Sequence, residues 1–199
     1  MEELNPFPFI FKTQFDFEFE DIREKVEDYI KRSKELTEKD GLITPERDGG
    51  ITTVVLNDFP HLWEEMEPLK EFLAECVGEY WRRMDFHNGL SKRVERSWIN
   101  KHPQGGWTGD HNHHGICLAV ACYLHVPPGS GRLMVKNPMM PYKMAEPLHP
   151  SFFPMGMEWS YIDVKTNDML LFPGWLNHKT EVNETNQDRY IMSLNIKSE

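Results

Sequence analysis

Six short segments after residue 91 are typical of β-strands, and they constrain the fold more than any other feature of the sequence. Turn-forming pairs such as Pro-Gly and Asn-Asp separate them. The segments are RVERSWIN (93–100), ICLAVACYLHV (116–126), GRLMVKN (131–137), EWSYIDV (158–164), DMLLF (168–172) and RYIMSLNI (189–196). Many short strands with turn signals between them predict a sandwich, a barrel or a jelly roll.

The first 90 residues have a different pattern, with two predicted helices at 21–37 and 60–84 and two predicted strands at 15–19 and 51–56. Pro60 suits the first turn of the second helix. That helix carries a helically spaced apolar stripe made of Leu62, Met66, Leu69, Leu73, Val77, Tyr80 and Trp81. We therefore expect one mainly β domain, 1–199. Residues 1–90 brace the β core at 91–199 from outside, and the inner face of the sheet holds the site.

Composition is that of a globular protein, with 39% hydrophobic and 27% charged residues in 199. A net charge of -10 disfavours nucleic acid as a partner, because an acidic surface repels phosphate. The three cysteines show no metal or redox spacing, which predicts reduced thiols in a cytoplasm. We expect neither a signal peptide nor a membrane span, because the N-terminus is acidic and no apolar run is long enough.

Nine histidines are many for this length, and four of them lie between residues 102 and 114. His111 and His113 are two positions apart, so in an extended segment both point to one face, as two ligands of one ion require. His178, near the end of the β half, is the candidate third ligand. Imidazole suits iron, zinc, copper or nickel, so the cluster does not name the metal. The alternative is a polar loop that is rich in histidine by chance.

Arg189 lies at the start of the last predicted strand, eleven residues after His178. The two-residue period places Ile191 and Ser193 on its face, and an apolar set, Tyr190, Met192 and Leu194, on the other. An arginine that faces the interior beside a metal must have a partner, and a dicarboxylate would fit its bidentate fork. A surface ion pair is the alternative for this residue.

The order of these motifs resembles a family of 2-oxoglutarate/Fe(II) oxygenases known from marine bacteria and phages. The resemblance covers about residues 93–197 and is carried by Trp98-x-Asn100, His111-x-His113, VACYLHVP at 120–127, Phe172-Pro173, His178, and Arg189 followed by Ser193. It implies a double-stranded β-helix (jelly roll) of roughly eight strands, and a dioxygenase that uses Fe(II), 2-oxoglutarate and O2, with hydroxylation as the expected reaction. It also implies that His111, His113 and His178 hold iron. Arg189 and Ser193 would hold the distal carboxylate of 2-oxoglutarate, with Asn100 and Tyr123 as further co-substrate contacts.

The broader superfamily uses His-x-Asp/Glu and a distal histidine, and here no histidine has an acid two positions on. If His111 is the first ligand, His113 takes the carboxylate position, which matches the H-x-H of the family. If His113 is first, Gly115 leaves that position vacant, as in iron halogenases. Asp110 is a third possibility. Hydroxylation and halogenation therefore both remain open at the level of sequence.

Two other functions fit the same sequence. One is a cupin-like metal dioxygenase with three histidines that does not use 2-oxoglutarate. The other is a non-catalytic jelly-roll binding module. Residues 138–157, a long segment rich in methionine, aromatic residues and proline, are expected to form a lid over the site. The substrate, a small molecule or a protein, and the oligomeric state are not specified by the sequence.

Overall fold

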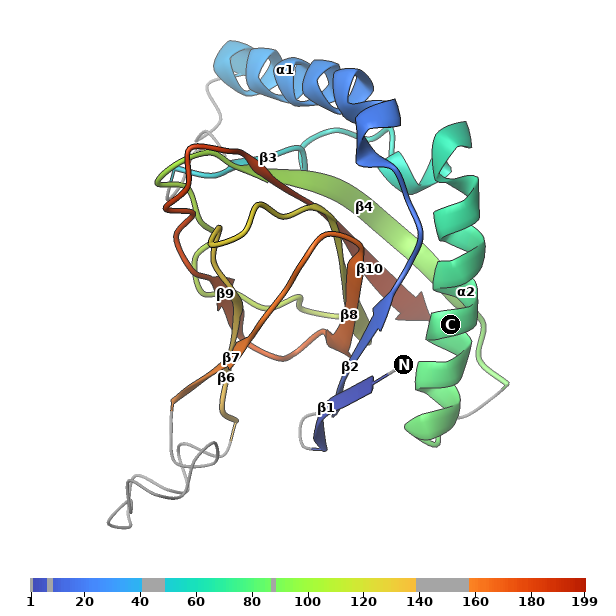
Figure 1. Ribbon diagram of the computed structural model, residues 1–199. Helices are drawn as coiled ribbons and strands as arrows, with labels where there is room; N and C mark the ends of the chain where they lie inside the picture. The colour runs from blue at the N-terminus through green and yellow to red at the C-terminus, as the bar shows by residue number, and fades with distance from the viewer. Residues whose placement is uncertain (1, 7–8, 41–48, 87–88, 139–157) are drawn as a thin grey trace.

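The computed structural model describes residues 2–6, 9–40, 49–86, 89–138 and 158–199. This part of the chain forms two antiparallel sheets, one of seven strands in the order β1-β2-β8-β5-β10-β4-β3 and one of three in the order β7-β6-β9 (Figure 1). The strands are β1 (Glu2–Pro6), β2 (Phe9–Gln14), β3 (Ile51–Thr52), β4 (Lys92–His102), β5 (Leu118–His125), β6 (Leu133–Lys136), β7 (Trp159–Ile162), β8 (Asp168–Pro173), β9 (His178–Thr180) and β10 (Arg189–Ser198).

Two long helices, α1 (Arg23–Asp40) and α2 (Glu67–Arg83), lie on the outside of the seven-stranded sheet (Figure 1). Short 3-10 turns, η1 (Phe19–Ile22), η2 (Pro60–Leu62) and η3 (Glu64–Met66), lead into them. The N-terminal flanking helices of the predicted fold are therefore confirmed. None of the helices in the described residues is long and apolar enough to cross a membrane.

Strand β5 is buried on both faces, which explains why its sequence is apolar throughout and does not alternate with polar residues. Its even-numbered residues, from Leu118 to Leu124, join the core beneath α1 and α2. Its odd-numbered residues Ala119, Ala121 and Tyr123 face the opposite way and join the core between the two sheets. A central strand that is covered on both faces buries every side chain along its length, and so loses the two-residue pattern.

The hydrophobic core between the two sheets closes the double-stranded β-helix. Leu133, Val135 and Ile162 of the three-stranded sheet pack against the inner face of the larger sheet, which contributes Phe172 and Ile191 among others. The two sheets thus enclose a space that is apolar at one end. The predicted jelly roll is confirmed, and the inner face of β10 carries Ile191 and Ser193 as the two-residue period indicates.

The N-terminal predictions need correction. Residues 15–19 are not a strand, because the strand is β2 at 9–14 and the chain then turns into η1. The strand expected at 51–56 shortens to β3. The helix expected at 60–84 begins only at Glu67, because Trp63 has an extended ψ of 144°, and Leu62 of the expected stripe is 64% exposed.

Residues 2–6 and 9–14 form a hairpin, β1 and β2, that adds to the large sheet beside β8. With β3, this hairpin means that the first 90 residues contribute strands to the large sheet in addition to the two helices that pack on its outside. Strand β9 was also not predicted, although it carries His178. The lid predicted at 138–157 lies, apart from residue 138, outside the described residues.

Candidate functional site

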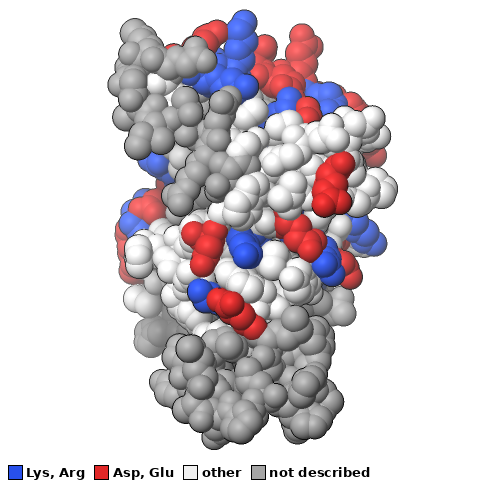
Figure 2. Space-filling view, turned by 90° about the vertical axis from the view of Figure 1, so that its left-hand side faces the viewer, with Lys and Arg blue, Asp and Glu red and all other residues white. Residues whose placement is uncertain are grey.

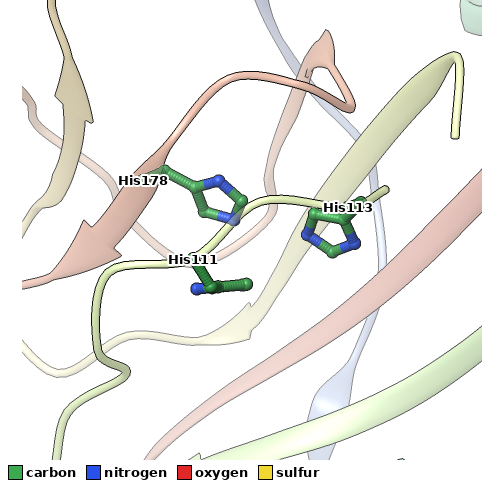
Figure 3. Close-up of side chains that lie close together, drawn as sticks. All are labelled: His111, His113 and His178. Carbon is green, nitrogen blue, oxygen red and sulfur yellow. The ribbon is translucent and has the colours of Figure 1, made fainter. Parts of the chain in front are cut away.

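His111 and His113, which are two residues apart, meet the distant His178 in the space between the sheets. His111 and His178 form an isolated antiparallel bridge in which each backbone N–H donates to the other residue's carbonyl, at 3.1 and 2.9 Å. The backbone N–H of His113 donates to the carbonyl of Gly174 at 2.8 Å. One ring nitrogen from each histidine lies within 4.8 Å of the others (Figure 3). These backbone hydrogen bonds fix the main-chain positions from which the three imidazole rings project.

Hydrogen bonds on the far side of two rings determine which nitrogen is free. Nδ1 of His111 lies 2.8 Å from the carbonyl oxygen of Gly109, and Nδ1 of His178 lies 2.8 Å from that of Leu176. A carbonyl only accepts, so Nδ1 carries the proton in both rings and Nε2 presents a lone pair. This backbone contact is the usual way in which a metal-binding histidine is oriented.

The third ring is held by stacking. His113 lies between Trp98, with ring centroids 5.8 Å apart, and His178, to which it is nearly parallel at 5.2 Å. Burial, and then the charge of His111, lowers the pKa of His113 to about 4 and that of His178 well below its ordinary value. Both imidazoles are therefore neutral at pH 7, which is the form that binds a metal.

A carboxylate is absent from this group in the part of the chain that the structure describes. Asp110, the alternative ligand, instead accepts a hydrogen bond from Asn177 Nδ2 at 2.9 Å and lies 3.7 Å from Lys136 Nζ. Gly115 has a positive φ of 72° and turns the loop toward β5. The donor set that the geometry offers is three imidazoles.

A cavity of about 340 Å³ adjoins the three histidines. Asn100, Tyr123 and Ser193 line it, and Asn100 Nδ2 donates to Ser193 Oγ at 3.0 Å across β4 and β10. Burial raises the pKa of Tyr123, so its hydroxyl remains a donor. Three of the four predicted co-substrate contacts are thus brought to one cavity with the three predicted ligands, and their roles remain predictions.

Arg189 lies on the inner face of β10, as the two-residue period of the strand predicts, but the His102 imidazole separates its guanidinium from the cavity. Its guanidinium is fully buried, and Nε and Nη2 both contact Nδ1 of His102, at 3.1 and 2.9 Å. The remaining N–H groups donate to the carbonyl oxygens of Ser130, Gly131 and Glu181. His102 lines the cavity, whereas Arg189 is not among the described residues that do.

The family follows from a match to the sequence profile described as "Putative 2OG-Fe(II) oxygenase", which covers residues 96–195, just over half of the chain. The chain belongs to this 2OG-Fe(II) oxygenase family. The motifs that carry the resemblance, from Trp98 to Ser193, all fall within the matched residues. A search of curated proteins finds no match.

Two solved structures with TM-scores above 0.5 support the fold of the oxygenase. A prolyl-4-hydroxylase from Pseudomonas putida has 10% sequence identity and a TM-score of 0.55, over 94% of this chain and 92% of that one. EctD from S. alaskensis, solved with bound Fe, has 15% identity and a TM-score of 0.56, over 94% and 72%. A 2OG-Fe(II) oxygenase family oxidoreductase from Burkholderia pseudomallei has 13% identity and a TM-score of 0.46. The match covers 67% of this chain and only 57% of that one.

The residues of the oxygenase fit the iron and the 2-oxoglutarate that the family uses. Three imidazoles, two of them with Nδ1 bonded to a backbone carbonyl and Nε2 free, suit a divalent iron. Burial lowers the pKa of Arg189 to about 10, so it is charged at pH 7, and none of the described carboxylates pairs with it. A buried guanidinium without an anion, near the hydroxyl of Tyr123, suits the distal carboxylate of 2-oxoglutarate.

Sequence reasoning did not assign His102 to the site. It is 1% exposed and stands directly opposite Arg189 in the register between β4 and β10. Its Nε2 lies 2.7 Å from Thr108 Oγ1. The signal that identifies it is this register, which pairs the two residues only once the strands are aligned.

Proposed function

We propose that this 2-oxoglutarate/Fe(II) oxygenase hydroxylates a C–H bond of a small molecule or of a protein side chain, and that His111, His113 and His178 hold its iron. One observation carries the proposal: three imidazoles converge beside a cavity, and a buried arginine behind the cavity wall has no carboxylate partner among the described residues. Iron and 2-oxoglutarate, when bound, supply the activation of O2.

The residues of the chain position the reactants and limit the access of water. The backbone bridge between His111 and His178 holds two ligands rigidly, which favours one metal geometry. The stacked ring of Trp98 restricts the motion of His113. Phe172, whose ring lies 4.8 Å from that of His178, adds an apolar wall.

The Asn100–Ser193 pair and Tyr123 give the cavity polar groups on an otherwise apolar inner face. We assign to them the orientation of 2-oxoglutarate, with Arg189 holding its distal carboxylate. Their grouping on neighbouring strands β4, β5 and β10 supports this assignment, because rigid strands fix such contacts more precisely than loops do.

Surface charge bears on the substrate class. On the face shown in Figure 2, basic and acidic side chains are interspersed. Arg132 pairs with Glu181 at 2.7 Å, and Lys136 lies 3.6 Å from Glu158. Together with the net charge of -10, these pairs favour a substrate other than nucleic acid.

The proposed activity is tested without knowledge of the substrate, because such oxygenases are expected to convert 2-oxoglutarate slowly in its absence. Protein reconstituted with Fe(II) is incubated with 2-oxoglutarate and O2, and succinate is measured. We expect succinate from the wild type and none from His178→Ala. Metal binding without any conversion of 2-oxoglutarate would contradict the proposal.

Among the described residues the donor set contains no carboxylate, which favours one second candidate, a three-histidine metal dioxygenase that does not use 2-oxoglutarate. It shares the metal prediction but not the co-substrate. Protein that binds iron yet neither binds nor consumes 2-oxoglutarate would support this candidate. Protein that binds no metal would instead support a binding module.

A further inference from the structure

We propose that His102 holds the place of the distal carboxylate of 2-oxoglutarate on Arg189, and that co-substrate binding displaces its imidazole from the guanidinium. His102 is then a positioning residue that keeps Arg189 ordered before the co-substrate arrives. The inference rests on the proposed function, because it assumes that Arg189 receives that carboxylate.

The contact geometry is the first argument. The Nε and Nη2 groups of Arg189 form the edge that binds carboxylates through two parallel hydrogen bonds. Here both groups point at one acceptor, Nδ1 of His102, at 3.1 and 2.9 Å. One nitrogen lone pair is thus shared by two donors, where a carboxylate would offer each donor its own oxygen.

The charge balance is the second argument. The guanidinium is fully buried, and each of its contacts among the described residues is to a neutral acceptor. The carboxylate of Glu181 accepts no hydrogen bond from Arg189, because Arg132 binds that carboxylate at 2.7 and 2.8 Å; its charge acts on Arg189 only through space. A buried cation with neutral partners gains from an anion, since charge-assisted hydrogen bonds are roughly twice as strong as neutral ones.

Access is the third argument. His102 lies at the wall of the cavity, together with Thr108 and Gly50. A Cβ at position 50 would lie 3.0 Å from Cδ2 of His102, so the glycine keeps that side of the ring free of a side chain. The imidazole is neutral, because burial and the charge of Arg189 lower its pKa to about 3. Its departure therefore breaks hydrogen bonds but no ion pair.

The three carbonyl contacts explain why Arg189 can release His102 without losing its own position. Ser130, Gly131 and Glu181 hold the Nη1 and Nη2 atoms from the side away from His102. The rival arrangement keeps His102 in place, with its Nε2–H or the hydroxyl of Thr108 contacting the carboxylate. The two arrangements differ in what happens to Nδ1 of His102.

The decisive experiment follows the ring nitrogens of His102 by NMR in histidine-labelled protein, with zinc in place of iron to avoid paramagnetism. The probes are 2-oxoglutarate and 2-oxobutanoate, which has the same chelating groups but no distal carboxylate. We expect Nδ1 of His102, assigned by its absence in His102→Ala, to move to the frequency of an unbonded nitrogen with 2-oxoglutarate only. An unchanged Nδ1 signal at saturation would overturn the inference.

Affinities supply a second measurement. The ratio of the dissociation constants of 2-oxobutanoate and 2-oxoglutarate reports the contribution of the distal carboxylate. We expect His102→Ala to keep this ratio within about threefold of the wild type or to raise it, because Arg189 and its carbonyl contacts remain, and threefold is under 1 kcal/mol. A tenfold fall would mean that His102 itself holds the carboxylate, and would overturn the inference.

His61→Ala is the matched control, because His61 is also a buried imidazole bonded to a neutral hydroxyl, that of Ser97 at 2.7 Å, and does not line the cavity. It should leave the ratio unchanged. If the wild type binds neither keto acid, the proposed function fails together with this inference. If it binds 2-oxoglutarate but His102 stays in place, only this inference fails.

Discussion

His111 and His178 face each other across a backbone bridge in which both hydrogen bonds are made. The two rings start from fixed positions, and each donates Nδ1–H to a carbonyl two residues earlier in the chain. Their Nε2 atoms are therefore directed before any metal binds. Such preorganisation reduces the entropy that metal binding must overcome.

This arrangement predicts one divalent ion per chain, lost when a bridging ligand is removed. His178→Ala should reduce bound metal to background, because deleting a ligand costs more than the 10–100-fold that typifies loss of a supporting contact. Metal analysis after dialysis measures it. His114→Ala, which changes an exposed neighbour of the site, is the control. Equal metal content in wild type and His178→Ala would refute the assignment.

Arg189→Ala should keep the metal but lose 2-oxoglutarate. Removing the guanidinium deletes a charge-assisted contact of about 1.5–3 kcal/mol, which corresponds to about a 10–100-fold weaker binding. The visible charge-transfer band of the anaerobic Fe(II) complex reports that binding. Arg93→Ala removes an exposed arginine that binds Glu199 and does not line the cavity, and it serves as the control. If the band of Arg189→Ala appears at the same 2-oxoglutarate concentration as in the wild type, another residue binds the distal carboxylate.

The strands and most of the site could be predicted from the sequence because they depend on local patterns. The period of two places Ile191 and Ser193 on one face of β10, and the spacing of His111 and His113 marks a ligand pair. The mutual position of His102 and Arg189 depends instead on the register between β4 and β10. Register is set by the whole sheet, so a single strand does not reveal it.

The N-terminal errors have a related cause. Phe15 and Phe19 are both buried, as an alternating strand would require. Phe15 reaches the core from an irregular segment after β2 and Phe19 from a 3-10 helix, because tertiary packing overrides the local pattern. Trp63 breaks the expected long helix although its own side chain packs against the core beneath α1 and α2. A hydrophobic stripe shows which residues are buried more reliably than it shows where a helix begins.

Gly174 should be sensitive to substitution, because a Cβ there would lie 2.2 Å from the carbonyl oxygen of Ile116. Its own carbonyl accepts the N–H of His113, so Gly174→Ala should push apart the loops that carry His113 and His178. We expect a loss of about 1–3 kcal/mol in the free energy of unfolding, and weaker metal binding. Urea unfolding and metal titration measure these two effects.

Gly78 offers the matched control for that substitution. It is exposed on α2, and a Cβ there would meet nothing within 4 Å. Gly78→Ala should raise the free energy of unfolding by about 0.5–1 kcal/mol, because alanine loses less backbone entropy in a helix. A Gly174→Ala variant with the stability and metal affinity of the wild type would contradict the prediction. It would show that the segments at His113 and His178 accommodate the added Cβ without loss of stability.

The last prediction concerns the pH dependence of stability. The pKa of His102 is lowered from 6.5 to about 3 in the folded protein, chiefly by burial and then by Arg189, the charged group that faces it. Between these values the unfolded chain binds a proton that the folded protein does not. The free energy of unfolding therefore falls as the pH decreases from 6.5 toward 3.

His102→Asn removes this titration while it keeps an acceptor oxygen for Arg189. Between about pH 7.5 and about pH 5, the wild type should lose about 2 kcal/mol more of its free energy of unfolding than the variant does. The other histidines are the same in both proteins, so their contributions cancel in the difference. Urea denaturation at the two pH values measures it. If both proteins lose the same free energy of unfolding, the pKa of His102 is not lowered in the folded protein. Its imidazole then cannot be buried against the charged guanidinium of Arg189.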